Sequence, residues 1–175
     1  MDFPVPRVIS RLLAHEWELL KTLRLASLKD EPDAFSPTWQ DTAALGDDRW
    51  RAGAERFGVP AVAMFILRPD RGLMSATCDI DGVGHIGAMW VQPSARGSGH
   101  GSALLDTGLD FLANCGCEMI ELSVTETNVH ALRLYESRGF ELTGVDEPLR
   151  DGSPLRNLFM RWRTASGSQQ STPQC

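Results

Sequence analysis

The spacing of hydrophobic and polar positions changes several times along the chain, and each change marks the boundary of an expected helix or strand. Leucines among helix-forming residues predict helices over 16–29 and 99–114, and a further helix is expected over 128–138. The pair Ser36-Pro37 is typical of a helix start and predicts another helix that runs toward Phe57. Ser36 is expected to be the N-cap of the second helix, which Gly46 could interrupt. Apolar runs and alternating patterns predict strands over 5–12, 60–67, 73–80, 85–91, 118–124, 140–143 and 158–162.

The order of these elements predicts a mixed sheet of the α/β class. A turn at 68–72 and an Asp81-Gly82 turn join three consecutive strands, which indicates an antiparallel meander. The strand over 85–91 is followed by a helix and then by the strand over 118–124. Such a unit makes parallel neighbours through a right-handed crossover. We therefore expect one sheet with helices on both faces.

The length of 175 residues fits one domain with a real core and is short for two. No internal repeat and no second domain is visible, so we expect a single domain over 1–163. The segment 164–175 is rich in Ser, Gln and Thr and is expected to be a flexible tail.

Composition and charge exclude some partners. The net charge is −6 and no Lys/Arg cluster occurs, which argues against a nucleic-acid partner. The acidity is compatible with a cationic small-molecule substrate and equally with plain solubility. No apolar run approaches the roughly 18 residues of a membrane span, and the N-terminus lacks the pattern of a signal peptide. We expect a cytoplasmic protein with no membrane partner.

The four cysteines give little support to a metal site. Cys115-Gly116-Cys117 is a close pair, but no second Cys/His pair lies at a spacing typical of zinc sites. Without a secretion signal, disulfides are not expected either. We expect no metal, and reduced thiols that are mostly buried.

A glycine-rich turn, Arg96-Gly97-Ser98-Gly99-His100-Gly101, connects an apolar strand with an apolar helix. Three glycines in five residues let backbone N–H groups converge without a Cβ in the way, and the helix start adds free N–H donors and a positive dipole end. Such a turn is suited to a phosphate or pyrophosphate. Arg96 could add charge there or could orient the loop.

By itself the turn is a weak signal, and two common nucleotide sites do not fit it. A Walker loop would continue with Gly-Lys-Ser/Thr, which is missing here. A dinucleotide-binding turn normally follows the first strand of a parallel domain, with an acidic residue about 20 residues later. Three or four expected strands already precede this turn.

Two blocks of sequence together resemble the GNAT superfamily of N-acetyltransferases. Val91-x-Pro93-x-x-Arg96-Gly97-x-Gly99-x-Gly101 is similar to the acyl-CoA motif of the family, and Asn128-x-x-Ala131-x-x-Leu134-Tyr135-x-x-x-Gly139-Phe140 is similar to its second motif. The spacing between the blocks is also that of the family. The resemblance covers roughly 73–162, and the leading helices fit the variable N-terminal region.

The resemblance implies a GNAT-like sheet with a V-shaped splay between its fourth and fifth strands, and acetyl-CoA as the co-substrate. The pantetheine arm would lie in the splay, bonded by backbone groups near Met89 and Val91, one of which would polarise the thioester carbonyl. The pyrophosphate would lie on the N–H groups of 97–102, and Ala131 would leave room for the arm beside Asn128. The cofactor-binding residues expected on this basis are Met89, Trp90, Val91, Arg96, Gly97, Ser98, Gly99, His100, Gly101, Ser102, Asn128, Ala131 and Tyr135.

Two residues are expected to be catalytic. The resemblance makes Tyr135, the only tyrosine of the chain, the general acid toward the CoA sulfur. His85 lies six residues before Val91, near the place where several GNAT enzymes have the base that deprotonates the amine, and histidine titrates in the useful range. An aromatic packing residue and an ordinary strand histidine are the alternative interpretations. Weaker candidates for the acceptor site or the base are Glu31, Asp33, Glu126, Trp39, Trp50 and Phe57.

The sequence thus predicts an acetyl-CoA-dependent N-acetyltransferase that acts on a primary amine of a small molecule or peptide. Two alternatives stay open, which are an acyl-CoA-binding module without turnover and a protein N-acetyltransferase. The acceptor and the acyl-chain preference are not determined by the sequence. Either a monomer or a homodimer is expected.

Overall fold

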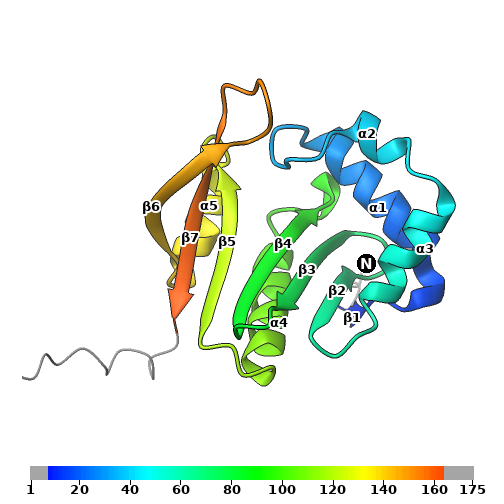
Figure 1. Cartoon of the computed structure of the whole chain (residues 1–175), viewed down its shortest axis with the longest axis horizontal. Coiled ribbons are helices and arrows are strands. Elements are labelled where there is room, and N and C mark those ends of the chain that lie inside the picture. The colour runs from blue at the N-terminus through cyan, green and yellow to red at the C-terminus, as the bar shows by residue number, and fades with distance from the viewer. Residues whose placement is uncertain (1–7, 164–175) are drawn as a thin grey trace, which may run out of the picture.

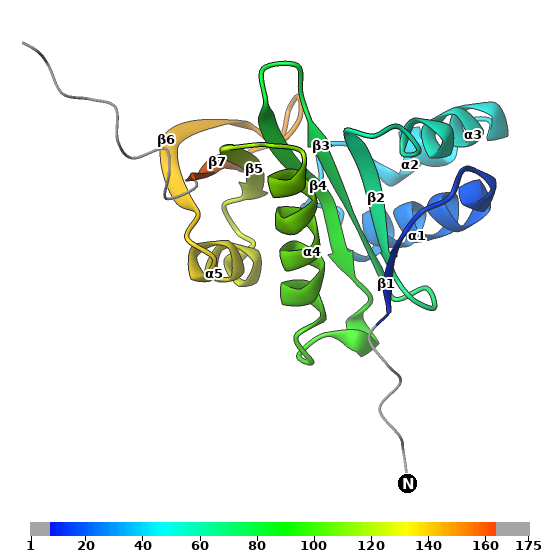
Figure 2. The same cartoon turned by 90° about the horizontal axis from the view of Figure 1, so that it is seen from below.

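The computed structural model describes residues 8–163, which form one seven-stranded sheet with helices on both faces (Figures 1 and 2). The strand order is β1-β2-β3-β4-β5-β7-β6. The strands are β1 (Ile9–Arg11), β2 (Val62–Leu67), β3 (Gly72–Cys78), β4 (Val83–Val91), β5 (Met119–Thr125), β6 (Glu141–Pro148) and β7 (Arg156–Arg163). The helices are α1 (Trp17–Asp30), α2 (Trp39–Ala43), α3 (Asp47–Arg56), α4 (His100–Asn114) and α5 (Val129–Ser137), with 3-10 turns η1 (Ala14–Glu16) and η2 (Pro93–Ala95).

The connections between the strands follow the expected pattern. Strands β2, β3 and β4 form an antiparallel meander, and α4 carries the chain from β4 to a parallel β5. Strand β7 then pairs with β5 along its whole length in the antiparallel sense, and β6 is the outer strand. The predicted mixed sheet, with its one parallel pair inside an antiparallel arrangement, is confirmed.

The parallel pair is short, and this opens the sheet. Strands β4 and β5 are joined only through Val83↔Met119, Gly84↔Ile120 and His85↔Glu121. Beyond His85 the two strands separate, as Figure 1 shows toward the end of the sheet where the chain leaves β4. The V-shaped splay implied by the family resemblance is present.

A β-bulge lies where β4 separates from β5. Trp90 is opposite Leu73 and Gly87 is opposite Ser75, so β4 has one residue more than β3 over this stretch. Within the bulge Ala88 has φ 50°, the only positive φ of a non-glycine residue in 8–163. A bulge bends its strand and increases the local twist, which turns the end of β4 away from β5.

Two hydrophobic clusters attach the helices to the sheet. The cluster on one face includes Met74, Leu104, Leu112, Ile120 and Tyr135 and is covered by α4 and α5. The cluster on the other face is covered by α1 and α3, as Figure 2 shows. It consists of Leu12, Leu20, Leu23, Trp50, Ala54, Met64, Ile66, Leu73 and Trp90.

The segment after α1 differs from its prediction. The N-cap of α2 is Thr38, whose side-chain oxygen accepts a bond from Asp41 N (3.1 Å), so the expected cap at Ser36 is wrong. The Ser36 hydroxyl instead accepts a hydrogen bond from Asn157 Nδ2 on β7 (3.3 Å). At Gly46 the chain does not continue as one helix, and α3 starts separately at Asp47.

The ends of the chain and the cysteines bring smaller differences. The first strand is limited to Ile9–Arg11, and part of the strand expected over 5–12, like the expected tail at 164–175, lies outside the described residues. Among the cysteines of the described chain, Cys117 is buried and Cys78 is half-buried, but Cys115 is exposed, against expectation.

The helices and the metal-ligating side chains of residues 8–163 bear on membranes and metals. None of the helices there is both long and apolar enough to cross a membrane. The same residues contain no group of three or more His, Cys, Asp or Glu side chains placed to hold a metal ion.

Candidate active site

The glycine-rich loop makes a tight turn into the first residue of α4. Gly97 has φ 78° and Gly99 has φ 76°, a backbone region that favours glycine. The His100 ring bonds back to Ala95 O through Nδ1 (2.8 Å), which ties the start of the helix to η2. The N–H groups at the beginning of α4 have no partners within the helix and lie at its positive dipole end. The loop therefore fits the predicted anion site.

Arg96 orients the loop, which resolves the choice that the sequence left open. Its Nε donates to Val91 O (2.9 Å), and its guanidinium forms ion pairs with Asp30 and with Glu31 (3.5 Å) at the end of α1. Asp30 also accepts a bond from Trp90 Nε1 (2.8 Å). With its charge compensated by two carboxylates, Arg96 fixes the loop against α1, and the backbone provides the donors for an anion.

A cavity of about 450 Å³ lies between the end of β4, the glycine-rich loop and α5. Every predicted cofactor-binding residue except Ser98 lines it. Glu31, His130 and Leu134 line it as well, although they were not predicted to bind the cofactor. We refer to it as the cofactor cavity.

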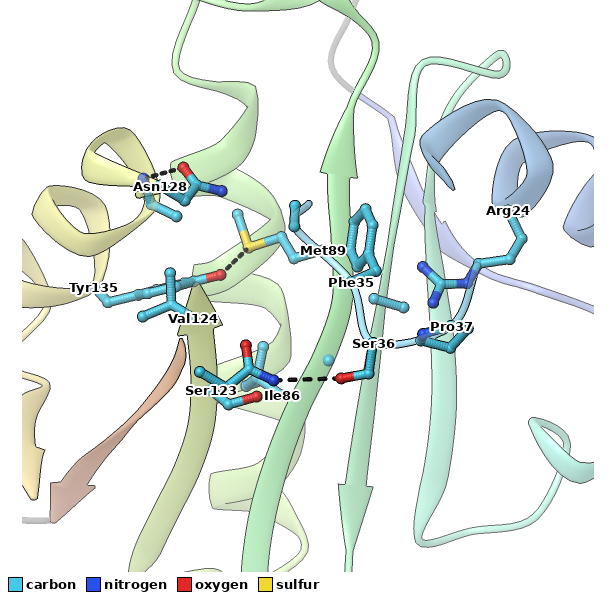
Figure 3. Close-up of a pocket in the computed structure, with 15 residues that line it drawn as sticks. Arg24, Phe35, Ser36, Pro37, Ile86, Met89, Ser123, Val124, Asn128 and Tyr135 are labelled. Carbon is cyan, nitrogen blue, oxygen red and sulfur yellow. Dashed lines mark hydrogen bonds between the residues drawn. The ribbon is translucent and has the colours of Figure 1, made fainter. Parts of the chain in front are cut away.

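A second cavity of about 200 Å³ lies in the splay, on the side of the loop that precedes α2 (Figure 3). We refer to it as the acceptor cavity. It shares four lining residues with the cofactor cavity, which are Met89, Asn128, Ala131 and Tyr135. The two cavities therefore meet at the bulge of β4 and the first two turns of α5.

Tyr135 lies at this junction. Its hydroxyl is directed at Met89 Sδ (3.7 Å), as Figure 3 shows, and its ring packs edge-on against Phe140 with centroids 6.0 Å apart. Burial raises the pKa of the Tyr135 phenol to about 12. The phenol therefore stays protonated at neutral pH, as a proton donor must.

Asn128 is the N-cap of α5. Its Oδ1 accepts a hydrogen bond from Ala131 N (3.1 Å), which satisfies one free donor of the first turn. Asn128, Ala131 and Tyr135 are separated by three and four residues and thus share one helix face. This shared face explains why the second sequence motif lines both cavities.

The structure places His85 away from this junction. His85 belongs to the last residue pair that joins β4 to β5, and its Nε2 bonds to Asp79 Oδ2 (2.8 Å) in the turn before β4. That bond is the main reason why the pKa of Asp79 is lowered. His85 lines neither the cofactor cavity nor the acceptor cavity. Its role as a base stays a prediction that this position does not favour.

The weaker candidates also lie outside the acceptor cavity. Glu31 is paired with Arg96, and the exposed Asp33 lies 3.9 Å from Arg150. Glu126 Oε1 accepts a bond from Arg156 N (3.0 Å). Trp50 and Phe57 belong to the cluster under α1 and α3, and Trp39 is exposed on α2.

Sequence reasoning missed several residues of the acceptor cavity, namely Arg24, Phe35, Ser36, Ser123 and Asn157. One of them carried a signal. Arg24 follows Leu20 by four residues and precedes Leu28 by four, so a cation stands on the apolar face of α1. The others come from a loop and two strands that only the folded chain brings together.

Comparison with known proteins agrees with this geometry. A model of the acetyltransferase (GNAT) family matches residues 16–140. Relatives include mycothiol acetyltransferases from Thermomonospora curvata, 44% identical over 120 residues, and from Thermobispora bispora, 42% identical over 125 residues. These alignments cover 67% and 71% of this chain but only 38% and 42% of the relatives, so the chain matches less than half of their length.

Solved structures share the fold over nearly the whole chain. An acetyltransferase of the GNAT family from Streptococcus pneumoniae has a TM-score of 0.77 at 17% identity and covers 91% of this chain and 100% of its own. A protein from Salmonella typhimurium, determined with its cofactor acetyl-CoA, has a TM-score of 0.74 at 19% identity and covers 97% and 99%. With the family model, the two motifs and the splayed sheet in agreement, the chain belongs to the GNAT family of acetyltransferases.

Proposed function

We propose that this chain is an acetyl-CoA-dependent N-acetyltransferase that acts on a primary amine of a small molecule. The observation that carries the proposal is the meeting of the two cavities at Met89 and Tyr135. A thioester entering from the cofactor cavity and an amine entering from the acceptor cavity would come together at that point.

Bound acetyl-CoA supplies an acetyl group activated as a thioester. The amine nitrogen forms a bond to the carbonyl carbon, the carbon–sulfur bond breaks, the nitrogen loses a proton, and the sulfur takes one up. Backbone N–H groups beside Met89 are proposed to polarise the carbonyl. Tyr135 is proposed to donate the proton to the sulfur, which its protonated phenol at the junction can do.

The acceptor cavity is lined by no Asp, Glu or His among the residues that the structure describes. The amine proton therefore has no direct acceptor there, and we propose that it leaves through water. The proposed role of His85 as base is tested by His85→Gln. If His85→Gln keeps most of the wild-type rate, that role is excluded. If His85→Gln loses most of the rate, the result supports His85 as a base that acts through water.

The size of the acceptor cavity bears on the acceptor. About 200 Å³ is below the roughly 300–1,000 Å³ of sites for drug-sized ligands. The size therefore limits the part of the acceptor that can reach the junction to a small group. The acceptor of the mycothiol acetyltransferases is a candidate through the relatives alone.

The absence of Asp, Glu and His from the described lining of the acceptor cavity also supports a second candidate function, an acyl-CoA-binding module without turnover. One experiment separates the two. The protein is titrated with acetyl-CoA by calorimetry and then incubated with labelled acetyl-CoA and a panel of amines that includes peptide N-termini. Binding with transfer supports the enzyme, binding without transfer supports the module, and no binding rejects both.

A further inference from the structure

Among the residues that the structure describes, Arg24 is the only charged one that lines the acceptor cavity. It projects from the inner face of α1, whose neighbouring positions Leu20, Leu23, Ser27 and Leu28 are buried. Its guanidinium lies over the Phe35 ring, 4.6 Å from the centroid, and Nη1 is 3.4 Å from Ser27 Oγ. Figure 3 shows the side chain reaching from α1 toward Phe35 and Pro37, across the cavity from Tyr135.

No anion compensates this charge within residues 8–163. Several other arginines there that are not fully exposed have carboxylate partners, for example Arg68 with Glu16 (2.8 Å) and Arg161 with Glu121 (2.7 Å). Arg11 lacks one but donates to two backbone carbonyls. Within these residues, the only hydrogen bond that the Arg24 guanidinium donates is the long one to Ser27 Oγ. Burial alone lowers the pKa of Arg24 to about 10, as expected for a desolvated cation without an anion beside it.

The rest of the cavity wall is neutral and combines polar with apolar side chains. Strand β7 contributes the buried Asn157, whose Nδ2 donates a hydrogen bond to Ser36 Oγ (3.3 Å), and β5 contributes Ser123. Phe35, Ile86 and Val124 are apolar. A cation in such a wall attracts a carboxylate and repels a second cation. Although the chain is acidic overall, none of the described residues that line this cavity is Asp or Glu.

We infer that the acceptor is a small primary amine that carries a carboxylate, such as an amino acid with an apolar side chain. Arg24 binds the carboxylate, and the amino group lies toward Met89 and Tyr135. The inference rests on the proposed function and deepens it, because it names the chemical class of the acceptor. Polyamines and other polycations are excluded by the same charge.

The test uses matched acceptors and the full chain. L-Leucine, L-methionine and L-phenylalanine are each compared with their carboxamides, with spermidine as a polycation, and release of CoA is measured. Because a carboxamide lowers the pKa of the neighbouring amine, rates are compared at equal concentrations of neutral amine. The wild type is expected to prefer at least one acid over its amide.

Arg24→Met then removes the charge while keeping an unbranched side chain. We expect kcat/KM for the preferred acid to fall about 10- to 100-fold, the range of a lost hydrogen-bonded charge contact, and that for the amide to change little. Arg24→Lys keeps the charge and should recover part of the loss. Arg51→Met is the matched control, since Arg51 also lies over an aromatic ring, that of Trp17 (4.5 Å), outside the cavity.

The outcomes separate this inference from the proposed function. Equal or better turnover of the amides or of spermidine by the wild type overturns the inference and leaves the acetyltransferase in place. An equal loss for acids and amides in Arg24→Met does the same. If Arg24→Met does not fold, the acid-over-amide ratio of the wild type and of Arg24→Lys decides. Transfer to no amine, with acetyl-CoA bound, rejects the proposed enzyme and the inference with it.

Discussion

At the scale of single residues, the structure separates groups that we propose to contact the reacting atoms from groups that hold the surrounding loop and strand in place. Tyr135 and Met89 lie at the junction of the cavities, whereas Arg96 and His85 are engaged in bonds elsewhere. All four residues were selected from the sequence, Arg96 and Tyr135 within the two motifs and His85 and Met89 by their position before the first motif. Their neighbours in space, such as Asp30 for Arg96 and Asp79 for His85, decide which of them can take part in chemistry.

Tyr135→Phe tests the proton donor. The ring and its packing on Phe140 are retained, so the KM for acetyl-CoA and the thermal midpoint should stay close to wild type. We expect kcat to fall about 100-fold, the lower end of the range for a lost general acid. Steady-state kinetics on the best acceptor measure it. A kcat within a factor of about two of wild type would show that the leaving sulfur needs no proton from this phenol.

At the scale of elements, the start of α5 combines a structural and a functional role in Asn128. Asn128→Ala removes the cap and should lower the free energy of unfolding by about 1 kcal/mol. Asn128→Ser keeps a capping oxygen and should stay near wild type in stability. If the amide also contacts the pantetheine arm, both variants raise the KM for acetyl-CoA. A raised KM in Asn128→Ala alone would limit the residue to capping.

The glycine-rich loop allows a sharper comparison. Gly99→Ala forces a side chain into the left-handed region at φ 76°, which costs about 1–2 kcal/mol and displaces the N–H donors. We expect the KM for acetyl-CoA to rise. Gly116→Ala is the control, since Gly116 has φ 85° at the other end of α4, with nothing within 4 Å of an added Cβ. Its strain should lower stability without changing the KM, and equal KM values in both variants would contradict the role of the loop.

At the scale of the whole molecule, two buried acids should make the fold sensitive to alkali. Burial raises the pKa of the Cys117 thiol from 9.0 to about 12 and that of the Tyr135 phenol from 10.0 to about 12. A group with a raised folded-state pKa contributes stability that is complete below its unfolded pKa and is lost as pH rises through the folded one. The denaturant concentration at the unfolding midpoint should therefore decrease as the pH is raised from 9 to 12.

Denaturant unfolding under reducing conditions measures this effect, with Tyr135→Phe/Cys117→Ala as the comparison. The double variant lacks both groups, so its midpoint should fall less steeply with pH, and the difference between the two curves removes the contribution of all other groups. Parallel curves for the two proteins would show that neither buried group governs alkaline stability.

The sequence by itself determined most of the elements, the parallel crossover and the cofactor motifs. These features depend on local periodicity and on the positions of glycines, which can be recognised from residues close together in the sequence. The cofactor cavity was predictable for the same reason, because one loop and one helix face supply most of its wall. The cap of α2 was mispredicted because the Ser36 hydroxyl is engaged by Asn157, 121 residues away.

Only the tertiary structure decided the acceptor side. Its wall combines α1, the loop before α2, β4, β5, α5 and β7, and no short-range pattern records which side chains from these distant segments will meet. The splay depends on a bulge that shifts the register of two strands. In the sequence, Arg24 is recognisable only as a cation on the apolar face of a helix. The cavity beside it, in which the described residues place no carboxylate, is what supports the proposed binding site for an acidic group.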